Sequence, residues 1–349
     1  MKKHSDVTKK LEHNTTAYQS NKIITVAILT YNSAKTINEC LESLIAQTFK
    51  QFDVIVIDDN STDNTLKIVL KYLKNKKLNI KILKNGSHSI PTGRNIALRK
   101  AKRGIVAFLD SDDSAQSDWL EIITATYKKD PSLAMIFGKQ VLTYNTYFAK
   151  AIAYNDSAAR KLFIHGILLF CTCNCAINRD VIGDYYFNEN FKVAEDLEFA
   201  TRVGENYKWK YVSRMKVNHK TRDNPQEYAK QMYLYGIWKI YYNYWASSYR
   251  IIDYVPLCAA IFCIFLSLFN PYLLFAIFIL PLAQMTISIL NSEAAVIDLP
   301  TMFIGWCIKN TSWTIGVICG VITLLSIPNL RKMFASKKLT RSVNGNEVL

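Results

Sequence analysis

The sequence predicts an α/β fold, in which a mostly parallel, Rossmann-like sheet is flanked by helices and followed by an α-helical transmembrane region. Three observations predict it. Short apolar, β-branched runs alternate with segments whose apolar residues recur at helical spacing, a pattern typical of parallel strands joined by helices. Two of these runs end in clusters of acids. Beyond about Tyr254, long apolar runs replace the alternation.

The expected elements follow one another in a regular order. The run I-I-T-V-A-I-L at 23–29 is the first strand, and residues 34–46 behind it carry apolar residues at helical spacing. Further strands are expected at 52–57, 79–83, 105–109, 133–137 and 171–177. Further helices are expected from 63, at 94–102, at 119–127 and from 194.

The strand expected at 105–109 runs directly into the acids Asp110, Asp112 and Asp113. If strand geometry persists, Asp110 and Asp112 share one face and repel each other unless a cation lies between them. Hard, oxygen-seeking Mg²⁺ or Mn²⁺ fits such a pair, and these ions usually hold substrate phosphates too. A solvated turn is the alternative, because Asp and Ser are turn residues.

A second strand end is also acidic. The strand at 52–57 ends in Asp58-Asp59-Asn60-Ser61, and the first strand ends near Thr30. Ligands of open α/β sheets bind outside the carboxyl ends of the strands, where these loops meet. Acids at the ends of two strands of one sheet therefore indicate a binding crevice.

Two further clusters have simpler interpretations. Glu195 and Asp196 begin an expected helix, where negative charge is favourable for the helix dipole. The alternating C-T-C-N-C at 171–175 lacks the paired spacing of metal ligands and indicates one face of a strand. The eight cysteines form no evident disulfide framework, which fits a reducing, cytoplasmic location for the soluble part.

The formal net charge of +15 does not indicate nucleic acid, because no basic stripe interleaved with aromatics stands out in the first part of the chain. Attraction to anionic membrane lipids, and the excess of basic residues that membrane proteins carry on their cytoplasmic side, explain the positive charge better.

The first 20 residues are polar and are expected to form a disordered tail rather than a signal peptide.

Membrane features dominate the second part of the chain. Aromatic and basic residues at 226–250 favour a helix in the membrane interface, with a packed soluble helix as the alternative. A span needs about 20 apolar residues. Apolar segments occur at 254–269, at 271–290 and within 299–325. Lys309 and Asn310 interrupt the third segment, so two to four spans remain open.

Five pieces of the sequence, taken in order, resemble a family 2 glycosyltransferase of the GT-A fold. These are V-A-I-L-T-Y-N at 26–32, V-I-D-D-N-S-T-D at 56–63, G-R-N at 93–95, D-S-D at 110–112 and E-D at 195–196. The resemblance covers residues 23 to about 222. Together with the composition of the rest of the chain, it divides the sequence into a tail at 1–20, a GT-A domain at 21–225, an interfacial helix at 226–250, membrane helices at 251–330 and a basic cytoplasmic tail at 331–349.

The resemblance also implies a nucleotide-sugar donor and a divalent metal cofactor, Mg²⁺ or Mn²⁺. Thr30 and Asp59 would hold the nucleotide, and Arg94 would contact the nucleotide or its diphosphate. Asp110 and Asp112 would coordinate the metal, which acts as a Lewis acid on the leaving diphosphate.

In this resemblance Asp196 would be the general base that takes a proton from the acceptor hydroxyl, with inversion at the anomeric carbon. Some relatives use a histidine near His219, whereas a lone histidine is more often structural. The helix expected near Gly93 could add backbone N–H groups to the phosphate site.

The leading hypothesis is thus a membrane-anchored, inverting, metal-dependent glycosyltransferase with a lipid-linked or membrane-proximal glycan acceptor. The Q-x-x-R-W signature of processive synthases is absent, because Gln231 is followed by Met-Tyr-Leu-Tyr, so single transfers are expected. A polyprenyl-phosphate glycosyl synthase is one alternative. A nucleotide-binding membrane scaffold without catalysis is a remote one. A nucleotidyltransferase is disfavoured because no glycine follows the first strand.

Overall fold

The computed structural model describes residues 24–101, 104–163, 170–247, 279–290 and 298–334, together with six isolated positions between 258 and 272. The chain forms two compact units. Unit 1 is Met1–Val141 with Phe170–His219, and unit 2 is Leu142–Leu169 with Lys220–Leu349. The expected N-terminal tail, the chain end from 335 and most of the apolar stretch at 251–278 lie outside the described residues.

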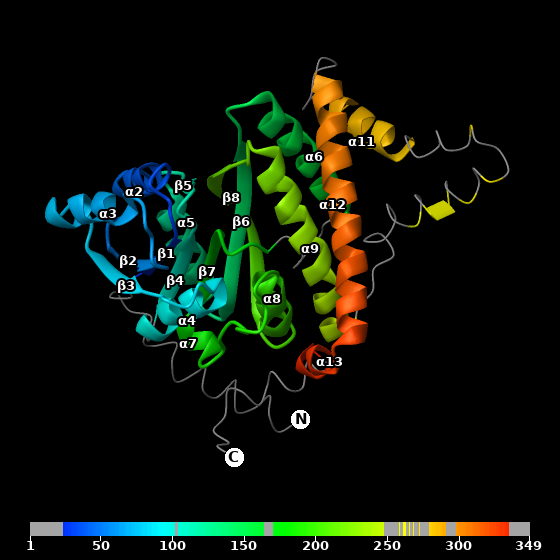
Figure 1. The fold of residues 1–349 in the computed structure, drawn as a ribbon. Coiled ribbons are helices and arrows are strands. Elements are labelled where there is room, and N and C mark those ends of the chain that lie inside the picture. The colour runs from blue at the N-terminus through cyan, green and yellow to red at the C-terminus, as the bar shows by residue number, and fades with distance from the viewer. Residues whose placement is uncertain are drawn as a thin grey trace. The chain divides into compact units, whose positions relative to one another are not determined.

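Unit 1 is built on an eight-stranded sheet with the order β3-β2-β1-β4-β7-β6-β8-β5 (Figure 1). Its strands are β1 Ile24–Thr30, β2 Phe52–Asp58, β3 Ile80–Lys84, β4 Ile105–Leu109, β5 Asp113–Ala115, β6 Leu133–Thr143, β7 Asn174–Asn178 and β8 Lys208–Lys220. The strands β3, β2, β1 and β4 pair in parallel, so their carboxyl ends share one edge. Beyond β4 the pairing of β7 with β4 and with β6 is antiparallel, as is that of β5 with β8.

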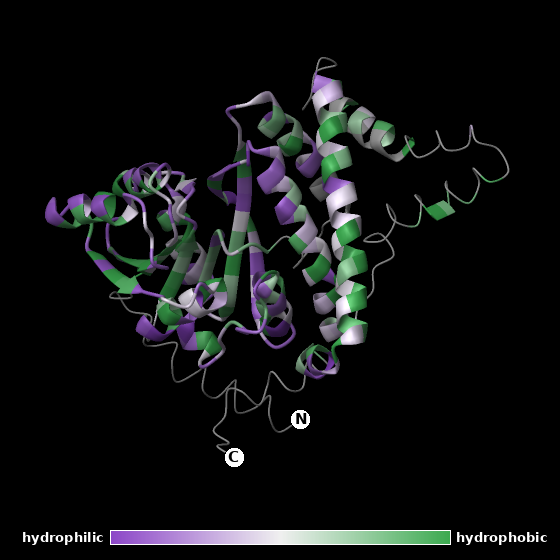
Figure 2. Ribbon diagram, viewed as in Figure 1, coloured by the Kyte–Doolittle hydropathy of each residue, from purple (hydrophilic) through white to green (hydrophobic). Residues whose placement is uncertain are grey.

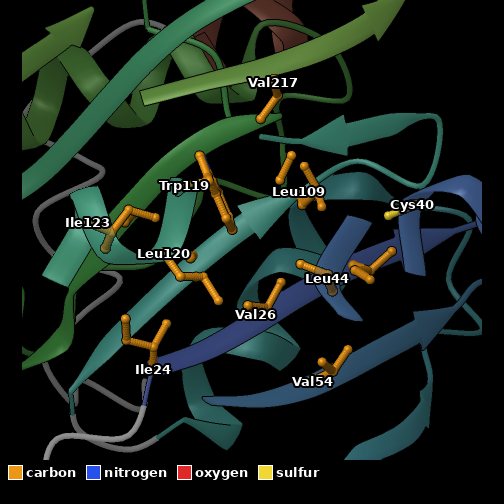
Figure 3. Close-up of a cluster of buried hydrophobic side chains, with 14 of the residues drawn as sticks. Ile24, Val26, Cys40, Leu44, Val54, Leu109, Trp119, Leu120, Ile123 and Val217 are labelled. Atoms are coloured by element: carbon orange, nitrogen blue, oxygen red, sulfur yellow. The ribbon is translucent and has the colours of Figure 1, made fainter. Parts of the chain in front are cut away.

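Amphipathic helices cover this sheet and close its core. They are α2 Ile37–Ile45, α3 Thr65–Lys74, α4 Ile90–Lys100, α5 Trp119–Lys129, α7 Arg179–Ile182 and α8 Glu195–Gly204. Figure 3 shows Val26 and Leu109 of the sheet among Leu44 of α2 and Trp119 of α5, all of which are buried. The indole Nε1 of Trp119 donates to Asn174 Oδ1 at 2.8 Å, which satisfies the polar atom of a fully buried ring.

Two local expectations are wrong. Helix α4 begins at Ile90 rather than near Gly93, because Ser89 caps it by accepting from Thr92 N and Pro91 occupies its first turn. Gly93 N donates to Ser89 O inside the helix, so it is not a free phosphate-binding donor.

The second wrong expectation concerns the cysteines at 171–175. Strand β7 begins at Asn174 instead of Cys171. A hydrogen bond from Asn174 N to Cys171 O closes a turn before the strand. Only Cys175 therefore lies in the strand, and the interpretation of all three thiols as one strand face does not hold.

Unit 2 is helical. Its helices are α6 Tyr147–Phe163, α9 Pro225–Ala246, α11 Ile279–Leu290, α12 Leu299–Ser326 and α13 Pro328–Phe334. Ion pairs join α6 to the C-terminal helices, from Lys150 Nζ to Asp298 Oδ1 at 2.9 Å and from Lys309 Nζ to Asp156 Oδ1 at 2.6 Å. The sequence did not predict α6.

Within the described part of the chain, one helix, α12, is long and apolar enough to cross a membrane. Figure 2 shows hydrophobic residues along much of it. Helices of this kind also occur in soluble cores, so length and composition alone do not assign α12 to a bilayer.

Helices α9 and α12 approach each other at glycines. A Cβ atom added at Gly316 would collide with the main-chain oxygen of Tyr233. At Gly305 of the same helix the nearest atom would be Asn155 Nδ2 at 3.6 Å, an ordinary contact.

Gly316→Ala is therefore expected to lower the free energy of unfolding by about 1–3 kcal/mol. Gly305→Ala is the matched control and is expected to be neutral or to stabilise by up to about 1 kcal/mol through helix propensity. Thermal unfolding in detergent compares the two variants. Equal effects of the two substitutions would contradict the close approach of α9 and α12.

Candidate functional site

The parallel strands of unit 1 bring polar groups to one edge of the sheet. Thr30 and Asp58 are the last residues of β1 and β2 and lie opposite each other in the ladder. Asp59 N donates to Thr30 O at 2.9 Å. Thr30 Oγ1 and Asp58 Oδ1 are buried and have no hydrogen-bond partner among the described residues. Such orphaned atoms are rare in native proteins and mark this edge as a place where a polar ligand could complete the bonding.

The predicted nucleotide residue Asp59 lies beside an aromatic surface. Its Oδ1 accepts from His88 N at 3.0 Å. The exposed ring of Tyr31 meets the His88 ring edge-on, with centroids 5.8 Å apart. The side-chain oxygen of Asn32 accepts from Thr62 N at 2.8 Å and so ties the loops after β1 and β2 together. This rim offers a carboxylate next to a flat apolar face.

The acids after β4 form a turn, not a continued strand. Asp113 N donates to Asp110 O at 3.0 Å, which leaves Asp112 exposed and Asp113 buried. Burial, and then the negative charge of Asp113, raise the pKa of Asp110 to about 7, although Arg94 opposes the shift. A cation would relieve this crowding of carboxylates, and their oxygens are the donors that Mg²⁺ and Mn²⁺ prefer.

Arg94 lies at the centre of a buried network of acids. It is almost fully buried, forms an ion pair with Glu195 and lies over the Phe187 ring at 5.5 Å from the centroid. Burial alone would lower the pKa of Arg94, but the charges of Glu195, Asp110 and Asp196 outweigh it and raise that pKa. The structure therefore brings the predicted diphosphate contact, metal residue and base together. The sequence did not reveal that Glu195 is the partner of Arg94.

Asp196 is positioned by the start of α8. The preceding Ala194 adopts a left-handed φ of +62°, which redirects the chain into the helix. Burial raises the pKa of Asp196, while the positive charge of Arg94 opposes the rise. A half-buried carboxylate with a raised pKa in a group of charges is a candidate general base.

His219 is joined to the same region by strand pairing. The β5–β8 register sets it opposite Asp113, and its Nδ1 lies 2.6 Å from Asp113 Oδ1. Burial would lower the pKa of His219, but the bond to Asp113 and its charge raise it to about 9. Donor atoms of Asp113, His219 and Cys173 all lie within 4.8 Å of one another. From the sequence, Asp113 had no predicted role in the site. The one sign of a role was that Asp113 is the third acid after the strand at 105–109.

Comparisons with known proteins show which family the first part of the chain resembles. Residues 25–186 match the family described as "Glycosyl transferase family 2". The chain is 31% identical over 183 residues to the poly(ribitol-phosphate) β-N-acetylglucosaminyltransferase TarS of Staphylococcus aureus, covering 51% of this chain and 32% of that protein. It is 27% identical over 169 residues to the UDP-Glc:α-D-GlcNAc-diphosphoundecaprenol β-1,3-glucosyltransferase WfgD of Escherichia coli. That alignment covers 47% of this chain and 64% of WfgD.

A solved structure supports the fold. The mannosyltransferase PcManGT of Pyrobaculum calidifontis, in complex with GDP-Man and Mn²⁺, superposes on this chain with a TM-score of 0.55 at 17% sequence identity. The superposition covers 87% of this chain and 88% of the PcManGT chain. The fold of unit 1 is accordingly of the GT-A type, as expected. The aligned region spans about a third of the length of TarS and less than two thirds of WfgD.

Proposed function

We propose that the chain, whose residues 25–186 match the family described as "Glycosyl transferase family 2", is a metal-dependent, inverting glycosyltransferase. It moves one sugar at a time from a nucleotide-sugar to a lipid-linked or other membrane-proximal glycan acceptor. The observation that carries the proposal is the assembly of Arg94, Asp110 and Asp196 into one charged network beside the strand ends. These residues come from α4, from the end of β4 and from the start of α8, and the proposal gives each a different role in the same reaction.

The nucleotide part of the donor is assigned to the ends of β1 and β2. The buried Thr30 Oγ1 lacks a partner, and the Asp59 carboxylate can accept from a base N–H or a ribose hydroxyl. The exposed Tyr31 ring offers an apolar face beside them. The diphosphate is assigned to Arg94, whose charge is held in place by Glu195.

Asp110 and Asp112 are assigned to a divalent cation, Mg²⁺ or Mn²⁺. When bound, such an ion supplies Lewis-acid stabilisation of the diphosphate as its bond to the sugar breaks. The crowding of Asp110 among neighbouring carboxylates supports this assignment, because a cation would offset their repulsion.

Asp196 is assigned to the acceptor side. Its carboxylate takes the proton from an acceptor hydroxyl while that oxygen attacks the anomeric carbon. The C–O bond to the diphosphate breaks on the opposite face, and the configuration inverts. The raised pKa of Asp196, which burial causes, makes it a stronger base than an exposed aspartate.

Membrane attachment is assigned to unit 2, with the domain boundaries given by the resemblance. The apolar helix α12 supports attachment, and the glucosyltransferase WfgD is named for a lipid-linked acceptor. In this proposal several helices between 251 and 330 span the cell membrane. The catalytic domain then faces the cytoplasm, where nucleotide-sugars are available.

Asp112→Asn is expected to weaken Mn²⁺-dependent binding of a nucleoside diphosphate by at least about 10-fold, because it removes a charged ligand from the proposed site. Calorimetric titration of UDP and GDP, with Mn²⁺ and with a chelator, measures the effect. Asp118→Asn is the control, since Asp118 is also exposed and lies six residues away. The assignment of Asp112 to a metal site is wrong if both variants bind the nucleoside diphosphate as tightly as the parent chain does. It is also wrong if the chelator does not weaken that binding.

The proposed activity is tested by identifying the product. The purified chain is incubated with membrane lipid extract, Mn²⁺ and a panel of nucleotide-sugars that includes UDP-glucose and UDP-N-acetylglucosamine. Mass spectrometry is expected to find one lipid-linked species heavier by a single sugar residue. Metal-dependent nucleotide binding with no product from any donor would instead favour the non-catalytic scaffold.

A further inference from the structure

The chain concentrates its positive charge in one stretch of unit 1. From Asn64 to Leu109 the sequence contains twelve lysines and arginines and no aspartate or glutamate, whereas the whole chain has a formal net charge of +15. Seven of these lysines lie in α3, in the turn after it and in β3, and all seven side chains are exposed. They are Lys67, Lys71, Lys74, Lys76, Lys77, Lys81 and Lys84. The proposed donor site uses none of them.

One face of α3 combines lysines with leucine. Four exposed residues recur at i, i+3, i+4 and i+7 and therefore lie on one side of the helix, namely Lys67, Leu70, Lys71 and Lys74. Leu70 is 42% exposed, and the neighbouring Leu73 is 38% exposed. Figure 2 shows hydrophobic and hydrophilic residues alternating along α3. The seven lysines, with these two leucines, form the basic surface of unit 1.

The positive charges of the basic surface are not neutralised by neighbouring acids. Among the residues that the structure describes, none of the seven lysines forms an ion pair. The end of α4 adds another cation, because contact with the Lys81 ammonium, through a hydrogen bond and charge repulsion, lowers the pKa of Lys100. Like charges in contact are unfavourable, and a nearby anion would offset their repulsion. The surface is therefore complementary to an extended negative charge.

The exposed leucines decide which kind of anion fits the basic surface. A soluble polymer of phosphates would contact the ammonium groups but would gain little from Leu70 and Leu73. A bilayer with anionic headgroups accommodates both, because leucine side chains enter the boundary between headgroups and acyl chains while lysines stay among the headgroups. Long lysine side chains suit this position, since their stems cover apolar surface and their charges remain in water.

We propose that the basic surface of unit 1 binds the anionic headgroups of a membrane, with Leu70 and Leu73 entering the boundary between headgroups and acyl chains. Unit 1 then contacts the membrane through a surface of its own, in addition to the attachment assigned to unit 2. The inference rests on the proposed membrane attachment but not on sugar transfer. A failed transfer assay therefore leaves it standing.

Acetylation of individual lysines, read out by mass spectrometry, tests this contact in the intact chain. The full chain is reconstituted in nanodiscs of neutral phosphatidylcholine or of a mixture rich in phosphatidylglycerol, and is acetylated briefly. Lys67, Lys71 and Lys74 are expected to react at least about 3-fold more slowly in the anionic nanodiscs. Lys128 and Lys129, which are exposed on α5, are the internal controls and are expected to react equally in both. Raising the salt from about 0.1 M to about 1 M is expected to remove the difference, because the charges are then screened within about 3 Å.

A pair of charge variants tests whether the lysines act together. Lys71→Gln combined with Lys74→Gln is expected to reduce the protection of Lys67 in anionic nanodiscs at least about 2-fold, because each lysine near the surface adds to the attraction. Lys128→Gln combined with Lys129→Gln removes the same charge from α5 and is the matched control. The control is expected to leave the protection of Lys67 unchanged.

A leucine variant tests the apolar contact. Leu70→Ser combined with Leu73→Ser keeps every lysine and is expected to reduce the protection by at least about half. Equal acetylation in neutral and anionic nanodiscs would overturn the inference, as would equal protection of the control lysines on α5. Protection by single-stranded RNA in detergent, with none in anionic nanodiscs, would make the basic surface a nucleic-acid site instead. Retention of the chain in neutral nanodiscs tests the attachment through unit 2 separately, because neutral lipid does not attract the basic surface.

Discussion

Asp196→Asn is expected to lower the rate of transfer to a sugar hydroxyl by about 10²- to 10⁴-fold, the usual contribution of a general base. The substitution keeps the shape of the side chain and its position at the start of α8, but an amide cannot accept the proton. Nucleotide binding is expected to change little, because the donor is assigned to other residues. Single-turnover rates with a radiolabelled donor and a hydroxyl acceptor measure the effect.

Asp184→Asn serves as the control, since Asp184 is exposed and belongs to the same unit. The control is expected to transfer sugar at the parent rate. If Asp196→Asn retains more than about a tenth of the activity, the proposed base is wrong. Such a result would favour a polyprenyl-phosphate acceptor, which is already ionised near neutral pH and needs no strong base.

Arg94→Met is expected to lower the free energy of unfolding by about 3–5 kcal/mol, the cost of breaking a buried ion pair. Methionine replaces the aliphatic stem, so the loss is chiefly one of charge. Glu195 would stay buried with no counter-charge, next to Asp110 and Asp196, whose negative charges add repulsion. Urea unfolding followed by circular dichroism measures the shift in the transition.

A second arginine of α4 provides the comparison. Arg99 lies 3.5 Å from Glu189, and both side chains are about half exposed. Arg99→Met is expected to cost less than about 1 kcal/mol, as surface ion pairs do. Adding Glu195→Gln to Arg94→Met is expected to restore part of the lost stability, because it removes the orphaned charge. Equal losses for Arg94→Met and Arg99→Met would disprove the buried network.

The sequence predicted the parallel part of the sheet well. The runs at 23–29 and 105–109 correspond to β1 and β4, because a buried parallel strand is a short apolar run that local composition reveals. The acids at 58–61 and 110–113 follow strand ends as expected. Because these strands pair in parallel, their carboxyl ends lie at the same edge of the sheet, so the parallel fold alone predicts that the acids meet there.

The antiparallel part and the contacts of the site were less predictable. Pairs such as Asp113 with His219 and Arg94 with Glu195 join residues about a hundred positions apart, so no local pattern records them. Helix α6 was not predicted, and in the structure its packing against α11 and α12 in unit 2 stabilises it. Roles for the site residues come from the family resemblance, and the variants above test them.

The place of α6 in the chain limits how this protein can be divided. Because α6 belongs to unit 2 but is encoded between β6 and β7, no single cut separates the two units. A fragment ending after β8 would keep α6 while losing the apolar residues that cover Ala151 and the aspartate that pairs with Lys150. Such a truncated enzyme is expected to aggregate, whereas replacing residues 143–169 by a short glycine-rich bridge offers a route to a water-soluble catalytic core.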